Sequence, residues 1–157
     1  MISPWSEIYK FKTPNVDSII LKESKKENEF LQKIYDWCGY KDIDLIYRGA
    51  RDGSTSDIFH TKCDNQGPTI CLYKNDKGNI FGGFSSISWT NSGKYHSAPD
   101  SFIFTLTNIN NIHPTKFILT DIKQAVFHDQ NEGPTFGYGE IEISKDFKKN
   151  CFMVLFP

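Results

Sequence analysis

The sequence has 157 residues, which is the size of a single domain. It carries 18 Lys and Arg residues against 19 Asp and Glu residues, so the net charge is −1 and no basic excess exists to neutralise nucleic-acid phosphates. Hydrophobic residues make up 38% of the chain, which is enough to fill a core, yet no apolar run approaches the roughly 20 residues that cross a bilayer. We therefore expect a globular protein with no nucleic-acid partner and no membrane insertion.

The cysteines and the N-terminal residues indicate a cellular compartment. The cysteines at positions 38, 63, 71 and 151 form no C-x-x-C pair, and a chain of this length does not need disulfides. The first five residues lack the positive start and the apolar stretch of a secretory signal. We interpret the cysteines as reduced thiols and expect a cytoplasmic protein, which reaches a membrane or a cytoskeletal complex only through partners.

The N-terminal part of the chain divides into an arm and the start of a domain. Residues 1–18 contain two prolines and no clear period, so we expect an N-terminal arm there and a domain over residues 19–157. Apolar residues at positions 16–21 favour a short strand.

A helix of about three to four turns is predicted over residues 25–38. Its apolar residues from Phe30 to Cys38 recur every three or four positions and form one stripe. Ser24 and Glu27 form an S-x-x-E capping box at its start, and Gly39 supplies a left-handed stop.

Beyond this helix the period changes to two, which is typical of strands. Ile43, Leu45 and Tyr47 alternate with polar neighbours, and a turn at residues 51–53 leads to a short second helix over residues 54–61. Further strands are predicted over residues 69–74, 79–89, 101–107, 115–119, 125–128, 136–144 and 151–156.

Two glycine-containing segments give detail to this pattern. Residues 75–78 predict a hairpin loop, and the pair Gly82-Gly83 inside a strand indicates a bulge or a close approach of another backbone or ring. About eight short strands separated by turns predict an α+β, mainly β fold: a sandwich of two antiparallel sheets flanked by two helices.

The sequence contains no clear catalytic or metal-binding pattern. His60, Cys63 and Asp64 offer three ligand types within five residues, but the second closely spaced pair of a zinc site is missing. Four cysteines and four histidines allow many thiolate–imidazole pairs, so they specify none. The glycine-rich residues 133–139 lack the Lys-Ser/Thr of a nucleotide cradle and lead into a strand. We therefore expect no catalytic residue, no cofactor and no metal.

Two groups of charged residues have two interpretations each. Glu140 and Glu142 alternate with isoleucines, and paired carboxylates perform glycoside hydrolysis, but a half-exposed strand shows the same pattern and is favoured. Arg48 and Arg51 beside Asp52 predict an ion pair that fixes a turn, with a partner-binding role as the alternative.

The order of the motifs is informative as a whole. The chain contains, in succession, the six segments LIYRGARDG (45–53), FHTKCDNQGPT (59–69), IFGGF (80–84), SW (88–89), DSFIFTL (100–106) and GPTFG (133–137). This series resembles the TLDc domain, which is shared by oxidation-resistance proteins and several TBC-type proteins. The resemblance implies a β-sandwich, binding and regulation of the V-type proton ATPase, protection against oxidative stress, and no agreed active site.

The resemblance also directs attention to particular residues. The candidate interaction or motif-structuring residues are Arg48, Arg51, Asp52, His60, Asp64 and Glu140. Two departures stand out: Tyr138-Gly139-Glu140 replaces the family's further glycines and Asp, and we expect the domain to be shortened at its C-terminal end, after residues 151–156. A missing last strand leaves an open sheet edge, so we expect residues 151–156 to pair inside the sheet or to be covered by a partner chain.

Three functions follow, in order of preference. The first is a non-enzymatic interaction module like the TLDc regulators of the V-type ATPase. The second is a structural subunit of a larger assembly, completed by a neighbouring chain. The third is a redox or hydrolytic enzyme, which we rank last because no residues combine nucleophile, base and orienting group.

Overall fold

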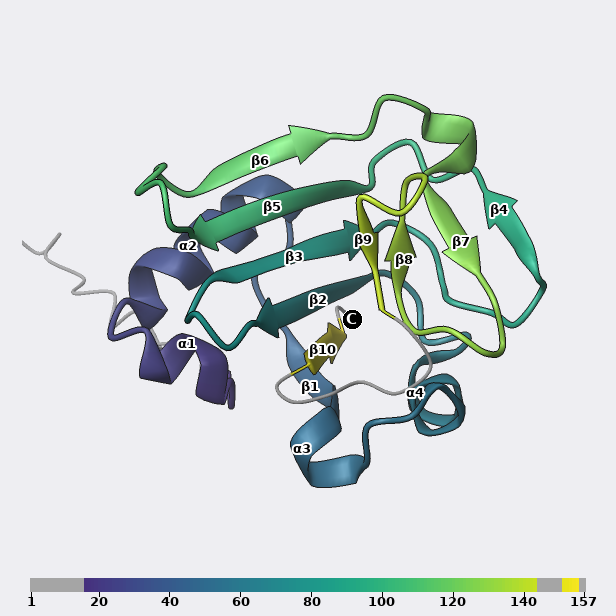
Figure 1. Cartoon of the computed structure of the whole chain (residues 1–157), viewed down its shortest axis with the longest axis horizontal. Helices are drawn as coiled ribbons and strands as arrows, with labels where there is room; N and C mark the ends of the chain where they lie inside the picture. The colour runs from purple at the N-terminus through teal and green to yellow at the C-terminus, as the bar shows by residue number, and fades with distance from the viewer. Residues whose placement is uncertain (1–15, 144–150, 156–157) are drawn as a thin grey trace, which may run out of the picture.

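Two antiparallel sheets organise the computed structural model of the chain, which describes residues 16–143 and the backbone of residues 151–155 (Figure 1). The larger sheet contains, in spatial order, β1 (Asp44–Arg48), β10 (Cys151–Leu155), β2 (Thr69–Lys74), β3 (Ile80–Ser85), β5 (Phe102–Thr107) and β6 (Thr115–Ile118). The smaller sheet contains β4 (Lys94–His96), β7 (Val126–His128), β8 (Thr135–Phe136) and β9 (Ile141–Glu142). The predicted α+β sandwich is therefore confirmed.

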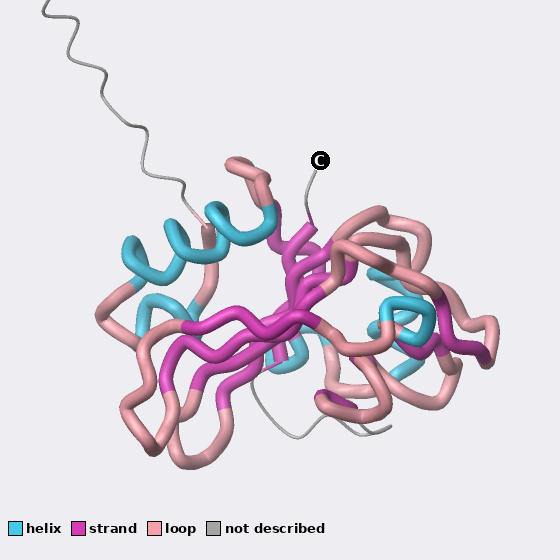
Figure 2. Tube along the Cα trace, turned by 90° about the horizontal axis from the view of Figure 1, so that it is seen from above, coloured by secondary structure: helices cyan, strands magenta, loops and turns pink. Residues whose placement is uncertain are grey.

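Short helices flank the sheets. They are α1 (Ile19–Glu23), α2 (Glu27–Cys38), the one-turn α3 (Gly49–Asp52), α4 (Ser56–Cys63) and the 3-10 turn η1 (Ile122–Gln124). Helices α1 and α2 lie on one face of the larger sheet, and the smaller sheet and α4 lie toward the other (Figure 2). None of the helices in the described part of the chain is long and apolar enough to cross a membrane.

The core has one apolar cluster on each side of the larger sheet. Alternation along β5 buries Phe102, Phe104 and Leu106 beneath α1 and α2. On the other side, Trp89 and Phe136 join residues of α4, β1, β2 and β7. The larger sheet is thus apolar on both faces, which explains the continuous burial of β2.

The predicted close approach at Gly82-Gly83 is present. A Cβ on Gly83 would lie 2.6 Å from ring atoms of Phe136, which belongs to the smaller sheet. A Cβ on Gly82 would overlap the carbonyl oxygen of Cys71 on the neighbouring strand. Gly83 thus lets the two sheets pack closely at this point, and Gly82 leaves room for groups of its own sheet.

The predicted strand over residues 16–21 is wrong, because helix α1 begins at Ile19. Ser18 caps this helix, and its Oγ accepts a hydrogen bond from the backbone N–H of Leu21 at 3.3 Å. The capping box of the next helix is wrong for a related reason. The Ser24 hydroxyl donates to the carbonyl of Leu21 and so ends α1, while α2 begins after Lys26 with no side-chain cap. Gly39 ends α2 in the left-handed conformation, as predicted.

Several other boundaries differ from the prediction. The turn expected at residues 51–53 is mostly the helix α3, and α4 lies two residues further along than expected. The strand expected over residues 79–89 ends at Ser85. The strand expected over residues 136–144 is split into β8 and β9, because Gly137 and Gly139 turn the chain with positive φ angles. Strand β4 was not predicted.

Strand β10 lies between β1 and β2 rather than at an edge. Its register places Met153 opposite Tyr47 of β1 and opposite Cys71 of β2. The expectation that this segment pairs inside the sheet is confirmed for residues 151–155, and the expected open edge at this place is filled by the chain itself. Residue 156 and residues 1–15 of the predicted arm lie outside the described residues.

Candidate functional site

Asp52 is the centre of the first cluster of predicted site residues. It closes the turn after β1, where its Oδ2 accepts a hydrogen bond from the backbone N–H of Arg48 at 2.9 Å. The Arg51 guanidinium donates from Nε and Nη2 to the two carboxylate oxygens, at 2.8 Å each. These Arg51 hydrogen bonds, together with the Arg48 N–H, lower the pKa of Asp52 to about 2. The ion pair favoured from the sequence is therefore present and fixes α3.

The side chain of Arg48 points to a different partner. Its Nη2 donates to the backbone carbonyl and, at 2.7 Å, to the Oδ2 of Asp17, just ahead of α1. The Arg48 hydrogen bond lowers the pKa of this exposed carboxyl below its usual value. Arg48 thus ties the segment before α1 to the end of β1, and no local pattern in the sequence indicates this contact.

His60 and Asp64 form a second, structural pair. One helical turn of α4 separates them, and Nδ1 of His60 lies 2.8 Å from Oδ1 of Asp64. The other ring nitrogen lies 2.8 Å from the carbonyl oxygen of Asp129 and 3.0 Å from that of Glu132. Because both ring nitrogens contact oxygen atoms, the ring links α4 to residues 129–132 and is not placed to act on a substrate.

Ion pairs of Asp52 join residues of helices α3 and α4 at one surface. We call residues Arg51, Asp52 and Lys62 the α3–α4 surface. The ammonium of Lys62 lies 3.7 Å from Oδ1 of Asp52 and so joins the two helices. The side chains of Arg51 and Lys62 are 46% and 39% exposed, whereas Asp52 is 10% exposed. The surface therefore presents two exposed cations, and both form ion pairs with the mostly buried carboxylate of Asp52.

Glu140 lies apart from this surface. It is exposed in the turn between β8 and β9, and its carboxylate occupies the space where a Cβ on Gly137 would be. Glu142 lies on β9, so the two acids do not form the strand pair that the sequence suggested. Neither borders the 540 Å³ pocket described below.

A histidine pair was missed by sequence reasoning. His96 and His128 come from neighbouring strands β4 and β7, and their rings stack with centroids 4.2 Å apart. Nδ1 of His128 lies 2.9 Å from the hydroxyl of Thr90, and the residue is 1% exposed. Burial, with the nearby His96 and His60, lowers the pKa of His128 to about 3, so the ring is neutral at physiological pH.

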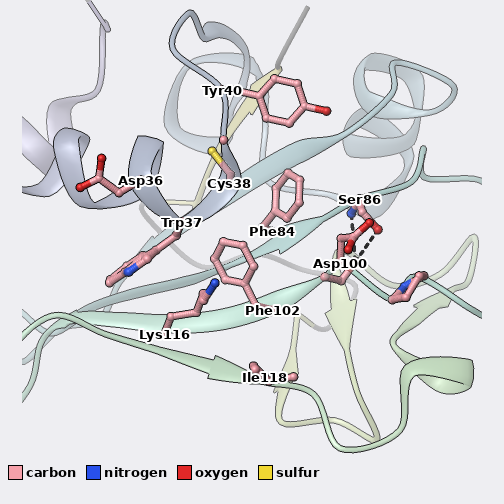
Figure 3. A pocket seen from close by; sticks show the side chains of 13 residues that line it. Asp36, Trp37, Cys38, Tyr40, Phe84, Ser86, Asp100, Phe102, Lys116 and Ile118 are labelled. Atoms are coloured by element: carbon pink, nitrogen blue, oxygen red, sulfur yellow. Dashed lines mark hydrogen bonds between the residues drawn. The ribbon is translucent and has the colours of Figure 1, made fainter.

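A pocket was also missed. It has a volume of about 540 Å³ and lies where α2 ends above strands β3, β5 and β6 (Figure 3). Its walls carry the aromatic rings of Trp37, Tyr40, Phe84 and Phe102, with Asp36, Asp100 and Lys116 around them. Only spatial proximity joins these groups, because they come from four separate parts of the chain.

These groups define the chemistry that is available. Within residues 16–143 no three or more His, Cys, Asp or Glu side chains are grouped so as to hold a metal ion. Cys63 and Cys71 are buried, and burial raises the pKa of Cys38, which disfavours its thiolate. The described residues also offer two exposed cations at α3 and α4 and an aromatic pocket beside the end of α2.

The fold is a sandwich of two antiparallel β-sheets, and comparison with known proteins gives its family. A model of the TLDc domain matches residues 15–154, so the chain belongs to the TLDc domain family. MTOR-associated protein MEAK7 of Danio rerio is 43% identical over 62 residues, which are 40% of this chain and 14% of that protein. The chain is thus similar to a small part of a longer relative.

Proposed function

We propose that this chain is a non-enzymatic regulatory module that binds the cytosolic part of the V-type proton ATPase and contributes to resistance against oxidative stress. The observation that carries the proposal is the TLDc match across residues 15–154, which extends the resemblance seen in the six sequence segments. The name of the similar protein MEAK7 records an association with another protein, which agrees with an interaction role for this fold.

The α3–α4 surface is the proposed contact. Arg51 and Lys62 are exposed cations on a rigid base, and charged groups of this kind supply orientation and rapid association in protein interfaces. Hydrogen bonds fix helices α3 and α4 beneath these cations, and the residues that make them are Asp52, Arg48, His60 and Asp64. We therefore assign these four residues a positioning role. Glu140 is an exposed acid that lies apart from this surface, and we propose it as a second contact for a protein partner.

Binding to purified V-type ATPase tests this function. The full chain is titrated against the enzyme, and both complex formation and the ATP hydrolysis rate are measured. The double variant Arg51→Ala/Lys62→Ala is expected to bind at least about tenfold more weakly, as loss of two interfacial charges implies. The control Lys77→Ala/Lys123→Ala removes two exposed charges elsewhere. Lack of binding by the unaltered chain would overturn the function, whereas equal binding by both variants would overturn the surface.

Two alternative functions have less support. A subunit completed by a neighbouring chain requires a gap in the sheet, but β10 of this chain lies between β1 and β2. An enzyme requires an accessible base, and both nitrogens of His60 are already in contact with oxygens. We expect His60→Ala and Cys63→Ser to change stability alone. A turnover abolished by either change, with an unaltered melting temperature, would revive the enzymatic hypothesis.

A further inference from the structure

The pocket beside the end of α2 has an apolar floor of aromatic rings. The rings of Phe84 and Phe102 lie 5.2 Å apart on adjacent strands β3 and β5, and Tyr40 and Trp37 each contact one of them from above. Helix α2 covers the sheet only as far as Cys38, and the left-handed Gly39 then turns the chain away. The uncovered end of this face is the pocket, whose 540 Å³ falls within the roughly 300–1,000 Å³ typical of ligand sites.

The charges of the pocket favour a basic occupant. Asp36 and Asp100 are exposed carboxylates at its rim, against the single cation of Lys116. The Lys116 ammonium lies 5.0 Å from the centroid of the Phe102 ring, so the aromatic wall already accepts a cation over its face. In such an occupant, aromatic side chains would pack against the rings of the pocket and basic side chains would pair with its carboxylates.

A segment of this chain has that composition. Residues 1–15 include the aromatic residues Trp5, Tyr9 and Phe11. They carry Lys10 and Lys12 against Glu7, so their side chains have an excess of one positive charge. Most of this segment lies before residue 15, where the TLDc match begins, so it is an addition to the family domain.

The attachment point is close enough for this segment to reach the pocket. Val16 is 3% exposed and belongs to the same apolar cluster as Phe84 and Phe102. Fifteen residues span up to about 50 Å when extended, whereas the whole of α2 is about 18 Å long.

We propose that the pocket formed by Trp37, Tyr40, Phe84 and Phe102 is a binding site for a basic, aromatic peptide segment, and that residues 5–12 of this chain are its ligand. The aromatic side chains fill the space beyond α2, and the lysines approach Asp36 and Asp100. The site thereby covers ring surface that the fold leaves open. This assignment is independent of pump binding through the α3–α4 surface.

Cys38 provides a native reporter, because it lines the pocket and is only partly buried. The full chain is treated with iodoacetamide under native conditions, and alkylation at each cysteine is followed by peptide mass spectrometry. We expect Trp5→Ala/Tyr9→Ala/Phe11→Ala to speed alkylation of Cys38 about tenfold. Asp36→Lys/Asp100→Lys is expected to act in the same direction, since it repels Lys10 and Lys12.

Matched controls separate this effect from unfolding. Ile2→Ala/Ser3→Ala/Ser6→Ala alters the same segment, and Asp76→Lys reverses a charge in the hairpin turn at the opposite end of β3; neither is expected to change the Cys38 rate. Cys63 and Cys71 are 0% exposed, so their alkylation reports global unfolding in the same spectra. The variants are compared only where these two remain protected, and milder single substitutions replace any that unfold.

The outcomes decide between occupants. The proposal is supported when Cys38 of the unaltered chain is alkylated slowly, at a rate that tenfold dilution does not change. The aromatic variant, Trp5→Ala/Tyr9→Ala/Phe11→Ala, must then react faster at Cys38. Protection that disappears on dilution assigns the site to the segment of a second copy and overturns binding within one chain. Equal Cys38 rates in the unaltered chain and the aromatic variant overturn the proposal and leave the pocket to an external partner.

Discussion

Asp52 holds three donors, and its removal should weaken the whole turn. The Arg48 N–H and the Arg51 guanidinium both contact its carboxylate. Asp52→Asn retains the shape but loses the charge, so we expect a loss of about 1–2 kcal/mol in the free energy of unfolding at pH 7. Urea denaturation measures it, and Asp76→Asn, in an exposed turn, should stay within about 0.5 kcal/mol.

The same carboxylate predicts a response to acid. Its pKa is about 2 in the folded protein, below the usual value near 4 in an unfolded chain. Its stabilising contribution is therefore complete above about pH 4 and disappears as the pH falls toward 2. The difference in stability between the unaltered protein and Asp52→Asn should shrink over this range. A constant difference would show that Asp52 acts without its charge.

The buried His128 should make the folding stability depend on pH in a higher range than Asp52 does. The pKa of His128 is about 3 when folded and near 6.5 when unfolded, so below pH 6.5 the unfolded chain binds a proton that the folded protein excludes. Stability should fall as the pH decreases from 6.5 toward 3, by at most about 1.4 kcal/mol per pH unit from this group. His128→Asn should flatten that slope, measured by urea denaturation, whereas His113→Asn at an exposed position should not.

At the scale of residues, sequence separation decides what could be predicted. Arg51 and Asp52 are adjacent, and His60 and Asp64 are one helical turn apart, so local patterns indicate both contacts. Asp17 contacts Arg48 across 31 positions, and no periodicity links two such distant residues. The pocket was missed for the same reason.

At the scale of elements, α2 is stabilised by its buried stripe. Ile34 is 0% exposed beneath this helix, and its neighbour Lys33 is exposed. Ile34→Ala should lower the free energy of unfolding by about 2–4 kcal/mol through lost burial and a residual cavity. Lys33→Ala should change it by no more than about 0.5 kcal/mol. Thermal or urea unfolding distinguishes them, and equal effects would contradict the assigned face.

Strand β3 should be intolerant of a single added methyl group. Gly83→Ala places a Cβ against the Phe136 ring, and we expect a loss of about 1–3 kcal/mol from overpacking between the sheets. The double variant Gly83→Ala/Phe136→Leu should lose less than the sum of the two single changes, because the smaller side chain gives space to the methyl group. If the double variant instead loses the sum of the two single changes, the added methyl group does not act through its contact with Phe136.

Elements with long, regular patterns were predicted well, and short ones were not. Strand β2 has the expected bounds, and β5 begins one residue later than expected. Residues 16–21 contain too few apolar positions to separate a strand from one helical turn, and the contact of Ser18 with Leu21 decides for the helix. The two-residue strands β8 and β9 exist through pairing with neighbours, which no local pattern contains.

At the scale of the whole molecule, β10 should be among the most protected segments. Its backbone pairs with β1 on one side and with β2 on the other, so its amides should exchange only on global unfolding. Hydrogen–deuterium exchange of the monomeric protein measures this directly. Fast exchange across residues 152–155 would show that the pairing is not kept in solution. Removal of residues 151–156 should give a poorly soluble or self-associating protein.

The position of β10 also bears on how the protein is made. During translation β1 and β2 leave the ribosome early, but the strand that belongs between them follows only when residue 155 has emerged. Until then the facing edges of β1 and β2 are unpaired and exposed to solvent. The larger sheet therefore closes only after β10 has been made, and a chain that ends before β10 has a vacant strand position between β1 and β2.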